Sequence, residues 1–179
     1  MTVQCFLLPA QQLPYRESGS QAPAAGGHVL SIERQYLDTK GQLLNINTLR
    51  SGDLVVVHLA VRATETVPDA LVVDLLPAGL ELENQNLAQS SASLTQASRA
   101  LREWQEAMQN ADIVHQEYRD DRYVAALAVP KGQVRHLLYL ARAVTPGRYV
   151  VPPAQVESMY RPEWQAYSDA PQVVQVKTR

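Results

Sequence analysis

The chain has 179 residues, of which 46% are hydrophobic, so it is long enough to form one domain with a complete core. Its formal charge of −2, spread over an even mixture of signs, argues against a nucleic-acid partner. The single cysteine excludes an internal disulfide and a cysteine-rich metal site. No apolar run approaches the roughly 18 residues that a membrane-spanning helix requires.

Residues 1–27 are expected to form an N-terminal tail and a linker. Residues 14–27 are rich in Gly, Pro, Ser and Ala, which bury little surface and keep the backbone entropy high. The apolar group around Cys5 lacks the basic residues and the cleavage site of a signal peptide. No cation near Cys5 in the sequence would activate its thiol, so we interpret it as passive. We interpret the chain as the C-terminal piece of a larger protein, whose upstream part would direct any export.

Residues 28–179 are expected to form a domain that consists mostly of β-strands. Apolar and polar residues alternate over residues 29–36, which is typical of a half-buried strand. The β-branched run within residues 49–63 predicts the central strand of a sheet. A further strand is predicted over residues 70–76, beginning after Pro68 because proline lacks the donor that a strand ladder needs.

One amphipathic helix is predicted over residues 90–110. Its apolar side chains recur at steps of three and four and form a single stripe: Leu94, Ala97, Leu101, Trp104 and Met108. Such a stripe is expected to cover an edge or a face of a sheet.

The second half of the chain again predicts strands. A hairpin is expected over residues 112–118 and 122–129, followed by a long strand over 134–144 and a short one over 148–151. Residues 173–177 are expected to form a last strand at a sheet edge. Seven or eight strands joined mostly by turns, with one helical crossover, indicate an antiparallel β-sandwich.

The residue types that carry catalysis and metal binding form no recognisable constellation. None of the four histidines has the i, i+4 spacing of a helical zinc pair, and we expect them at solvent-facing strand positions: His28, His58, His115 and His136. The sequence contains neither a nucleophile elbow nor a glycine-rich phosphate loop. We therefore predict no catalytic residue, no metal and no cofactor.

Residues 151–164 are the functional candidate. We interpret their prolines as preventing both a strand and a helix, although the segment carries the large side chains of Met159, Tyr160 and Trp164. These side chains either fold onto the domain's own core or form an exposed cluster that contacts a partner. Burial of both Met159 and Tyr160 inside the domain would contradict the second interpretation.

Four stretches, in this order, resemble the C-terminal domain of bacterial α-2-macroglobulins. They are VPDALVVDLLPAGLELEN (residues 67–84), HQEYRDDRYVAAL (115–127), YLARAVTPGRYVVPP (139–153) and VESMYRPEW (156–164). The resemblance implies a macroglobulin-like β-sandwich with a helical crossover, the last in a series of such domains.

The resemblance implies a part in a protease trap, in which a protease cuts a bait region and a Cys–Gln thioester then acylates or cages it. Cys5 lacks the C-x-E-Q context of that thioester, and no bait segment is present, so this chain is not expected to trap a protease by itself. It is not expected to be an enzyme, because no set of residues in the sequence supports turnover. It is instead expected to pack against the thioester domain, with Met159 and Tyr160 excluding water and Trp164 completing the interdomain contact.

The expected partners are upstream macroglobulin and thioester domains of the same polypeptide or operon, and proteases through the full-length protein. A peptidoglycan synthase of the same envelope system is a further candidate partner. The resemblance also implies a periplasmic location, as part of an inner-membrane-anchored lipoprotein with a role in host defence. The alternative function is a free-standing adhesion or carbohydrate-binding β-sandwich, because a fold does not determine a function.

Overall fold

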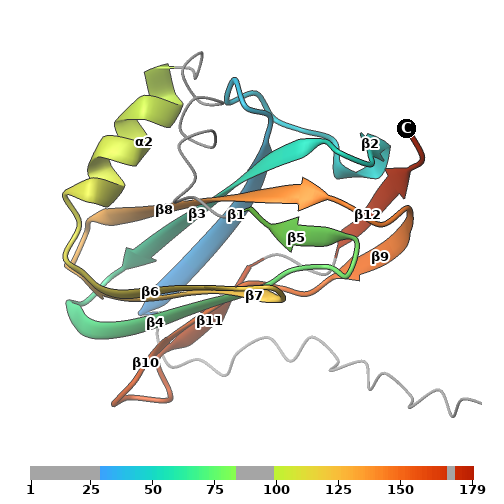
Figure 1. Ribbon diagram of the computed structural model, residues 1–179. Helices are drawn as coiled ribbons and strands as arrows, with labels where there is room; N and C mark the ends of the chain where they lie inside the picture. Colours follow the sequence, from blue (N-terminus) through green and yellow to red (C-terminus); the bar gives the residue numbers. More distant parts are fainter. Residues whose placement is uncertain (1–28, 84–98, 169–171) are drawn as a thin grey trace, which may run out of the picture.

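The structure is a computed structural model that describes residues 29–83, 99–168 and 172–179, and two β-sheets face each other in it (Figure 1). The four-stranded sheet has the order β1 (Leu30–Leu37), β3 (Leu54–Ala63), β8 (Val134–Ala143) and β5 (Leu80–Leu82). The five-stranded sheet has the order β11 (Gln165–Tyr167), β10 (Gln155–Ser158), β4 (Val67–Leu75), β7 (Arg122–Val129) and β6 (Ile113–Arg119). The predicted β-sandwich is therefore confirmed.

A third, small sheet lies at one end of the sandwich (Figure 1). It has the order β2 (Leu49–Arg50), β12 (Gln172–Lys177) and β9 (Gly147–Val151), and a short 3-10 helix, η1 (Ile46–Thr48), precedes β2. The last strand was expected at a sheet edge, and this expectation is wrong, because β12 lies between β2 and β9. Its pairing with β2 is parallel, whereas its pairing with β9 is antiparallel.

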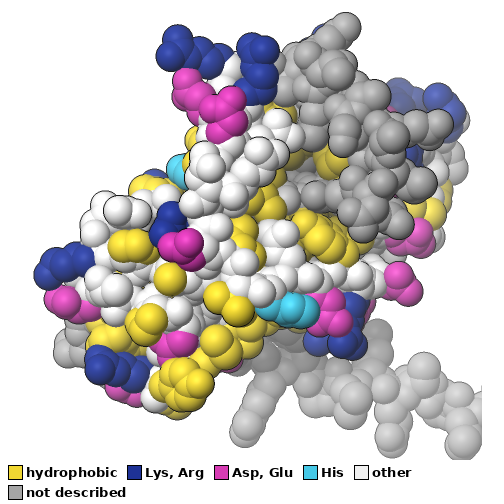
Figure 2. All heavy atoms as spheres, turned by 60° about the vertical axis from the view of Figure 1, so that its left-hand side comes forward, with side chains coloured by type: hydrophobic (Ala, Val, Ile, Leu, Met, Phe, Trp, Pro, Cys, Tyr) yellow, Lys and Arg dark blue, Asp and Glu magenta, His cyan; other side chains and the backbone are white. Residues whose placement is uncertain are grey.

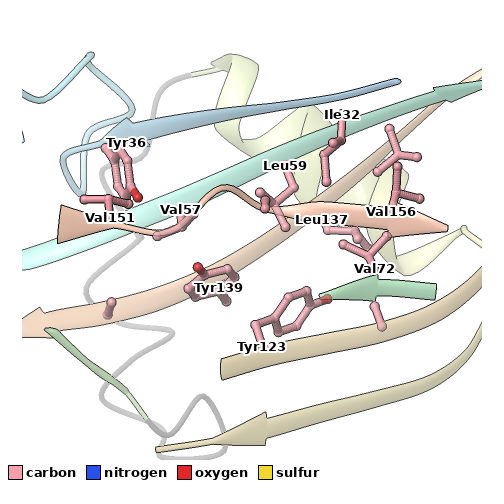
Figure 3. Packing of buried hydrophobic residues seen from close by; sticks show 14 of the residues in the cluster. Ile32, Tyr36, Val57, Leu59, Val72, Tyr123, Leu137, Tyr139, Val151 and Val156 are labelled. Carbon is pink, nitrogen blue, oxygen red and sulfur yellow. The ribbon is translucent and has the colours of Figure 1, made fainter. Parts of the chain in front are cut away.

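The core fills the space between the two large sheets (Figure 3). One sheet contributes Ile32, Tyr36, Val57, Leu59, Leu137 and Tyr139, and the other contributes Val72, Tyr123 and Val156. Full burial of a side chain such as Leu59 stabilises the fold by about 1.5–3 kcal/mol. The β-branched run predicted as the sheet centre forms β3, which pairs with β1 on one side and with β8 on the other.

The helix α2 (Arg99–Gln109) covers the outer face of the four-stranded sheet (Figure 1). Leu101 is fully buried there against Leu37, Val56, Leu138 and Leu140, and Trp104 and Met108 pack beside it. The predicted apolar stripe is confirmed for these three helix residues. Leu94 and Ala97 of the same prediction lie outside the described residues.

Two further expectations about prolines are corrected. Strand β4 begins at Val67 and so includes Pro68, and the strand pairing shifts register between Val67 and Ala70. This irregularity accommodates the residue that lacks a donor. The expectation that residues 151–164 form no regular structure is also wrong, since β10 pairs with both β4 and β11.

Twelve strands are present among the described residues, more than the seven or eight predicted, because several have only two to four residues. The division between a tail at 1–27 and a domain at 28–179 stays a prediction, since residues 1–28 lie outside the described part. Within that part, no helix combines the length and the apolar character needed to cross a membrane.

Candidate functional site

The candidate segment forms a hairpin at the edge of the five-stranded sheet. Strand β10 pairs with β4 on one side and with β11 on the other, and the loop between β10 and β11 projects away from the sheets (Figure 1). Met159 and Tyr160 are the first two residues after β10, and we call them the hairpin tip.

The side chains of the hairpin tip are exposed, as are residues 161–163 of the same loop, whereas Trp164 packs inward. Met159 is 49% exposed and Tyr160 is 84% exposed. The interpretation that Met159 and Tyr160 fold onto the core is therefore wrong. Trp164 is only half-buried and packs against the core, so for this residue the first interpretation holds. Figure 2 shows hydrophobic side chains gathered at the lower end of the molecule, where the hairpin of Figure 1 lies.

The backbone of the hairpin tip is held by Asp69, a half-buried residue of β4. The carbonyl oxygen of Asp69 accepts a hydrogen bond from the Met159 N–H at 3.0 Å, and its carboxylate Oδ2 accepts one from the Tyr160 N–H at 3.1 Å. The Ser158 hydroxyl donates to both carboxylate oxygens at 3.3 Å. The same hydroxyl oxygen accepts the Arg161 N–H at 3.2 Å. Three successive backbone N–H groups therefore donate, in turn, to the backbone carbonyl of Asp69, to its carboxylate and to the Ser158 hydroxyl.

The far side of the loop is closed by a second set of contacts. The Ser158 N–H donates to the carbonyl oxygen of Trp164 at 2.9 Å, and the Trp164 N–H donates to that of Arg161 at 2.8 Å. The Arg161 guanidinium lies over the Trp164 ring, 4.2 Å from the ring centroid. The loop thus has a fixed backbone and carries exposed side chains at the hairpin tip.

The connection that leads into β10 is tied to a buried ion pair. Arg34 of β1 pairs with Asp74 of β4 and donates to the carbonyl oxygen of Pro152 at 2.7 Å, and the Tyr139 hydroxyl donates to Asp74 at 2.7 Å. Burial raises the pKa of Asp74, and the adjacent Arg34 charge opposes this shift. Because Arg34 belongs to one sheet and Asp74 to the other, this pair links the two sheets next to the start of the hairpin.

The histidines were expected at solvent-facing positions, and this expectation is wrong for His58. His58 is 4% exposed, its Nε2 lies 2.9 Å from Nδ1 of His136, and its ring stacks on Trp104 of α2 at 3.9 Å. Burial and the neighbouring His136 and Arg62 lower the pKa of His58 to about 4.

His136 is half-buried and His115 is exposed, while His28 and Cys5 lie outside the described residues. No group of three or more potential metal ligands occurs in the described part of the chain. The nearly continuous apolar run of β3 is typical of a strand covered on both faces, and it was the sequence signal for the burial of His58. No comparable signal in the sequence indicated that Asp69 and Ser158 hold the hairpin tip.

Comparison with known proteins gives consistent results. Residues 30–163 match the family described as the bacterial alpha-2-macroglobulin MG10 domain. Alpha-2-macroglobulin of Escherichia coli is 56% identical over 156 residues, which cover 87% of this chain and 9% of the relative. The crystal structure of the native E. coli protein from domain MG7 to the C-terminus superimposes with a TM-score of 0.78 at 57% identity, covering 83% of this chain and 23% of that one.

The crystal structure of Salmonella alpha-2-macroglobulin reacted with methylamine superimposes with a TM-score of 0.74 at 53% identity, covering 83% of this chain and 9% of that one. The chain thus spans only 9% of the length of its E. coli relative. The matched range includes the four-stranded sheet, all of the five-stranded sheet except β11, the helix α2 and the hairpin tip. The chain therefore belongs to the bacterial α-2-macroglobulin family, in which it corresponds to the MG10 domain.

Proposed function

We propose that this domain packs against the thioester domain of a bacterial α-2-macroglobulin and shields the thioester from water until the bait region is cut. The observation that carries the proposal is the hairpin tip, where Met159 and Tyr160 extend two large side chains into solvent from a fixed backbone. Exposed apolar groups of this kind are typical of contact surfaces.

The chemistry of a thioester explains why such a cover is useful. A thioester is an activated acyl group that water hydrolyses, so its lifetime depends on the exclusion of water from the acyl carbon. Methionine fits irregular surfaces because its side chain is flexible, and tyrosine adds a large, stiff apolar ring with a polar end. The two side chains of the hairpin tip therefore suit a removable cover.

The full-length protein would act as an endopeptidase inhibitor, and this domain would take no catalytic part in it. The partners in this proposal are the upstream macroglobulin and thioester domains, and proteases through the full-length protein. The periplasmic location in a membrane-anchored lipoprotein, the role in host defence and the peptidoglycan synthase as a partner belong to the same proposal. Membership of the bacterial α-2-macroglobulin family supports the trap, and the methylamine-reacted Salmonella relative supports reactivity toward small amines.

The test uses the full-length protein that contains this chain. Met159→Ala combined with Tyr160→Ala should accelerate the release of the thioester thiol by methylamine at least about tenfold, since 1.4 kcal/mol of lost contact corresponds to a factor of ten. The matched control is Tyr167→Ala, which removes a tyrosine that is 56% exposed on the neighbouring strand β11. Unchanged thiol release in the double variant would overturn the shielding role, as would the absence of thiol release from both proteins.

The carbohydrate-binding alternative is tested with the 179-residue chain on a glycan array. The exposed rings of Tyr160 and Tyr167 are the groups on which a sugar would stack. Binding that disappears in Tyr160→Ala would favour this alternative, whereas the absence of binding would leave the interdomain contact as the function of the hairpin tip.

A further inference from the structure

The conformation of the hairpin tip depends on one side chain from a different strand. Asp69 precedes the regular part of β4, in the irregular section that follows Val67. Because Pro68 offers no N–H to the ladder, the strand departs from its regular pairing there. The carboxylate of Asp69 then reaches across to the neighbouring strand. It contacts the hydroxyl of Ser158, the last residue of β10, and the N–H of Tyr160 in the loop that follows.

We propose that Asp69 is a positioning residue that holds Met159 and Tyr160 in the conformation required for docking. This inference rests on the proposed function of the hairpin tip. It assigns to Asp69 no contact with the thioester. Its role is to fix the backbone from which the two shielding side chains extend.

The arrangement of donors around Asp69 supports this role. Successive backbone N–H groups in a turn form a concave site that favours a negative charge. Here the Tyr160 N–H reaches the carboxylate directly, and the Arg161 N–H reaches it through the Ser158 hydroxyl. Hydrogen bonds to an ionised acceptor are stronger than those between neutral groups. The negative charge of Asp69 therefore favours this turn over other conformations of the loop.

A fixed turn matters because the side chains of the hairpin tip have few contacts of their own. Tyr160 is 84% exposed and Met159 is 49% exposed, so packing within the domain constrains the direction of Tyr160 little and that of Met159 only in part. A mobile loop would lose backbone entropy on docking, and this loss would weaken the contact. By fixing the turn, Asp69 lowers this cost before the domains meet.

The first experiment measures amide hydrogen exchange in the 179-residue chain by NMR. In Asp69→Ala the Tyr160 N–H loses its acceptor, and we expect its exchange to accelerate about tenfold, the effect of one charge-assisted hydrogen bond. The Met159 N–H is an internal control, because it donates to the backbone carbonyl of Asp69, which alanine retains. Asp69→Asn keeps an acceptor oxygen but not the negative charge, and it should restore part of the protection.

A matched control removes an acidic group at the opposite edge of the same sheet. Asp121 lies in the turn between β6 and β7, where its carboxylate pairs with Arg122 at 2.7 Å. Asp121→Ala should leave the exchange of Tyr160 unchanged. Equal exchange of the Tyr160 N–H in the unmodified chain and in Asp69→Ala would overturn the inference.

The second experiment measures thiol release by methylamine in the full-length protein. Asp69→Ala should accelerate the release, by less than Met159→Ala combined with Tyr160→Ala. Asp69→Asn should lie between Asp69→Ala and the unmodified protein. If the double variant accelerates the release and Asp69→Ala does not, the positioning role fails and the shielding role stands. If the double variant has no effect, the shielding role itself fails, and the positioning role for docking fails with it.

Discussion

The helix-covered face of the four-stranded sheet and the hairpin tip of the five-stranded sheet both carry aromatic residues outside the central core, but they differ in exposure. On the first, Trp104 of α2 stacks over His58 and His136, and His58 is 4% exposed. On the second, Tyr160 is 84% exposed and no described residue covers it. The rings around Trp104 are thus packed within the domain, whereas the ring of Tyr160 remains exposed to solvent.

The difference shows which apolar residues serve the stability of this domain and which are available to a partner. The stripe of α2 is buried by the chain itself, so its residues should contribute to the free energy of unfolding. Tyr160 of the hairpin tip buries little surface within the domain, so truncation of its ring should leave the free energy of unfolding almost unchanged. Substitutions in the stripe of α2 should therefore lower the free energy of unfolding, whereas substitutions in the hairpin tip should weaken docking.

The largest expected effect is that of Leu101→Ala on the helix-covered face. Leu101 is fully buried between α2 and the sheet, so its truncation should reduce the free energy of unfolding by about 2–5 kcal/mol. Urea unfolding of the 179-residue chain measures this loss. Arg102→Ala, an exposed position on the same helix, should change it by less than about 0.5 kcal/mol. Similar losses in the two variants would contradict the burial of this face.

The second prediction concerns pH and the same face. The folded pKa of His58 is about 4, below its ordinary value of 6.5, so the unfolded chain takes up the proton first as pH falls. The contribution of His58 to stability is complete above pH 6.5 and should be lost progressively toward pH 4, by roughly 3 kcal/mol in total.

His58→Phe tests this prediction, because phenylalanine can still stack on Trp104 but does not titrate. The difference between the urea midpoints at pH 7 and pH 4.5 should be smaller in His58→Phe than in the unmodified chain. An identical pH dependence in both proteins would mean that His58 titrates alike in the folded and the unfolded chain.

A smaller effect is expected in the loop that carries the hairpin tip. Arg161→Ala removes the guanidinium that lies over the Trp164 ring and should cost about 0.5–1 kcal/mol of stability, as cation–π contacts at exposed sites do. Arg161→Lys keeps a positive charge and should lose less. Thermal unfolding of the three proteins measures the series, and a loss as large as that of Leu101→Ala would show that the loop is part of the core.

The smallest effect is predicted for the hairpin tip itself. Tyr160→Ser should change the free energy of unfolding by no more than about 0.5 kcal/mol, because the ring makes little contact within the domain. Calorimetry of the 179-residue chain measures this change. A destabilisation above about 1 kcal/mol would remove the distinction between the two regions and, with it, the argument that the hairpin tip is reserved for a partner.

Much of the fold could be predicted because its signals are local. The alternation over residues 29–36, the β-branched run of β3 and the apolar stripe of α2 each follow from the period of one element. The predictions that failed depended on partners far away in the sequence. Whether β12 lies at an edge depends on its pairing with β2 and β9, and whether a strand tolerates Pro68 depends on the pairing opposite it.

The candidate site was predicted in part. The density of large side chains in residues 151–164 indicated the segment, and the exposure of Met159 and Tyr160 agrees with the second interpretation of it. The anchor at Asp69 was missed, because it lies 91 residues before Tyr160 in the sequence. The role of Trp164 in an interdomain contact stays a prediction, and its packing against the core gives it a structural role as well.

The amino-acid sequence by itself determined the β-rich class, the main strands, the amphipathic helix and the family resemblance, because periodicity and composition act within short stretches of chain. Only the tertiary structure decided that His58 is buried, that β10 is a strand and that Asp69 holds the hairpin tip. Each of these depends on a neighbour brought close by the packing and pairing of strands and helices, and contacts between distant residues leave no trace in the period of either segment.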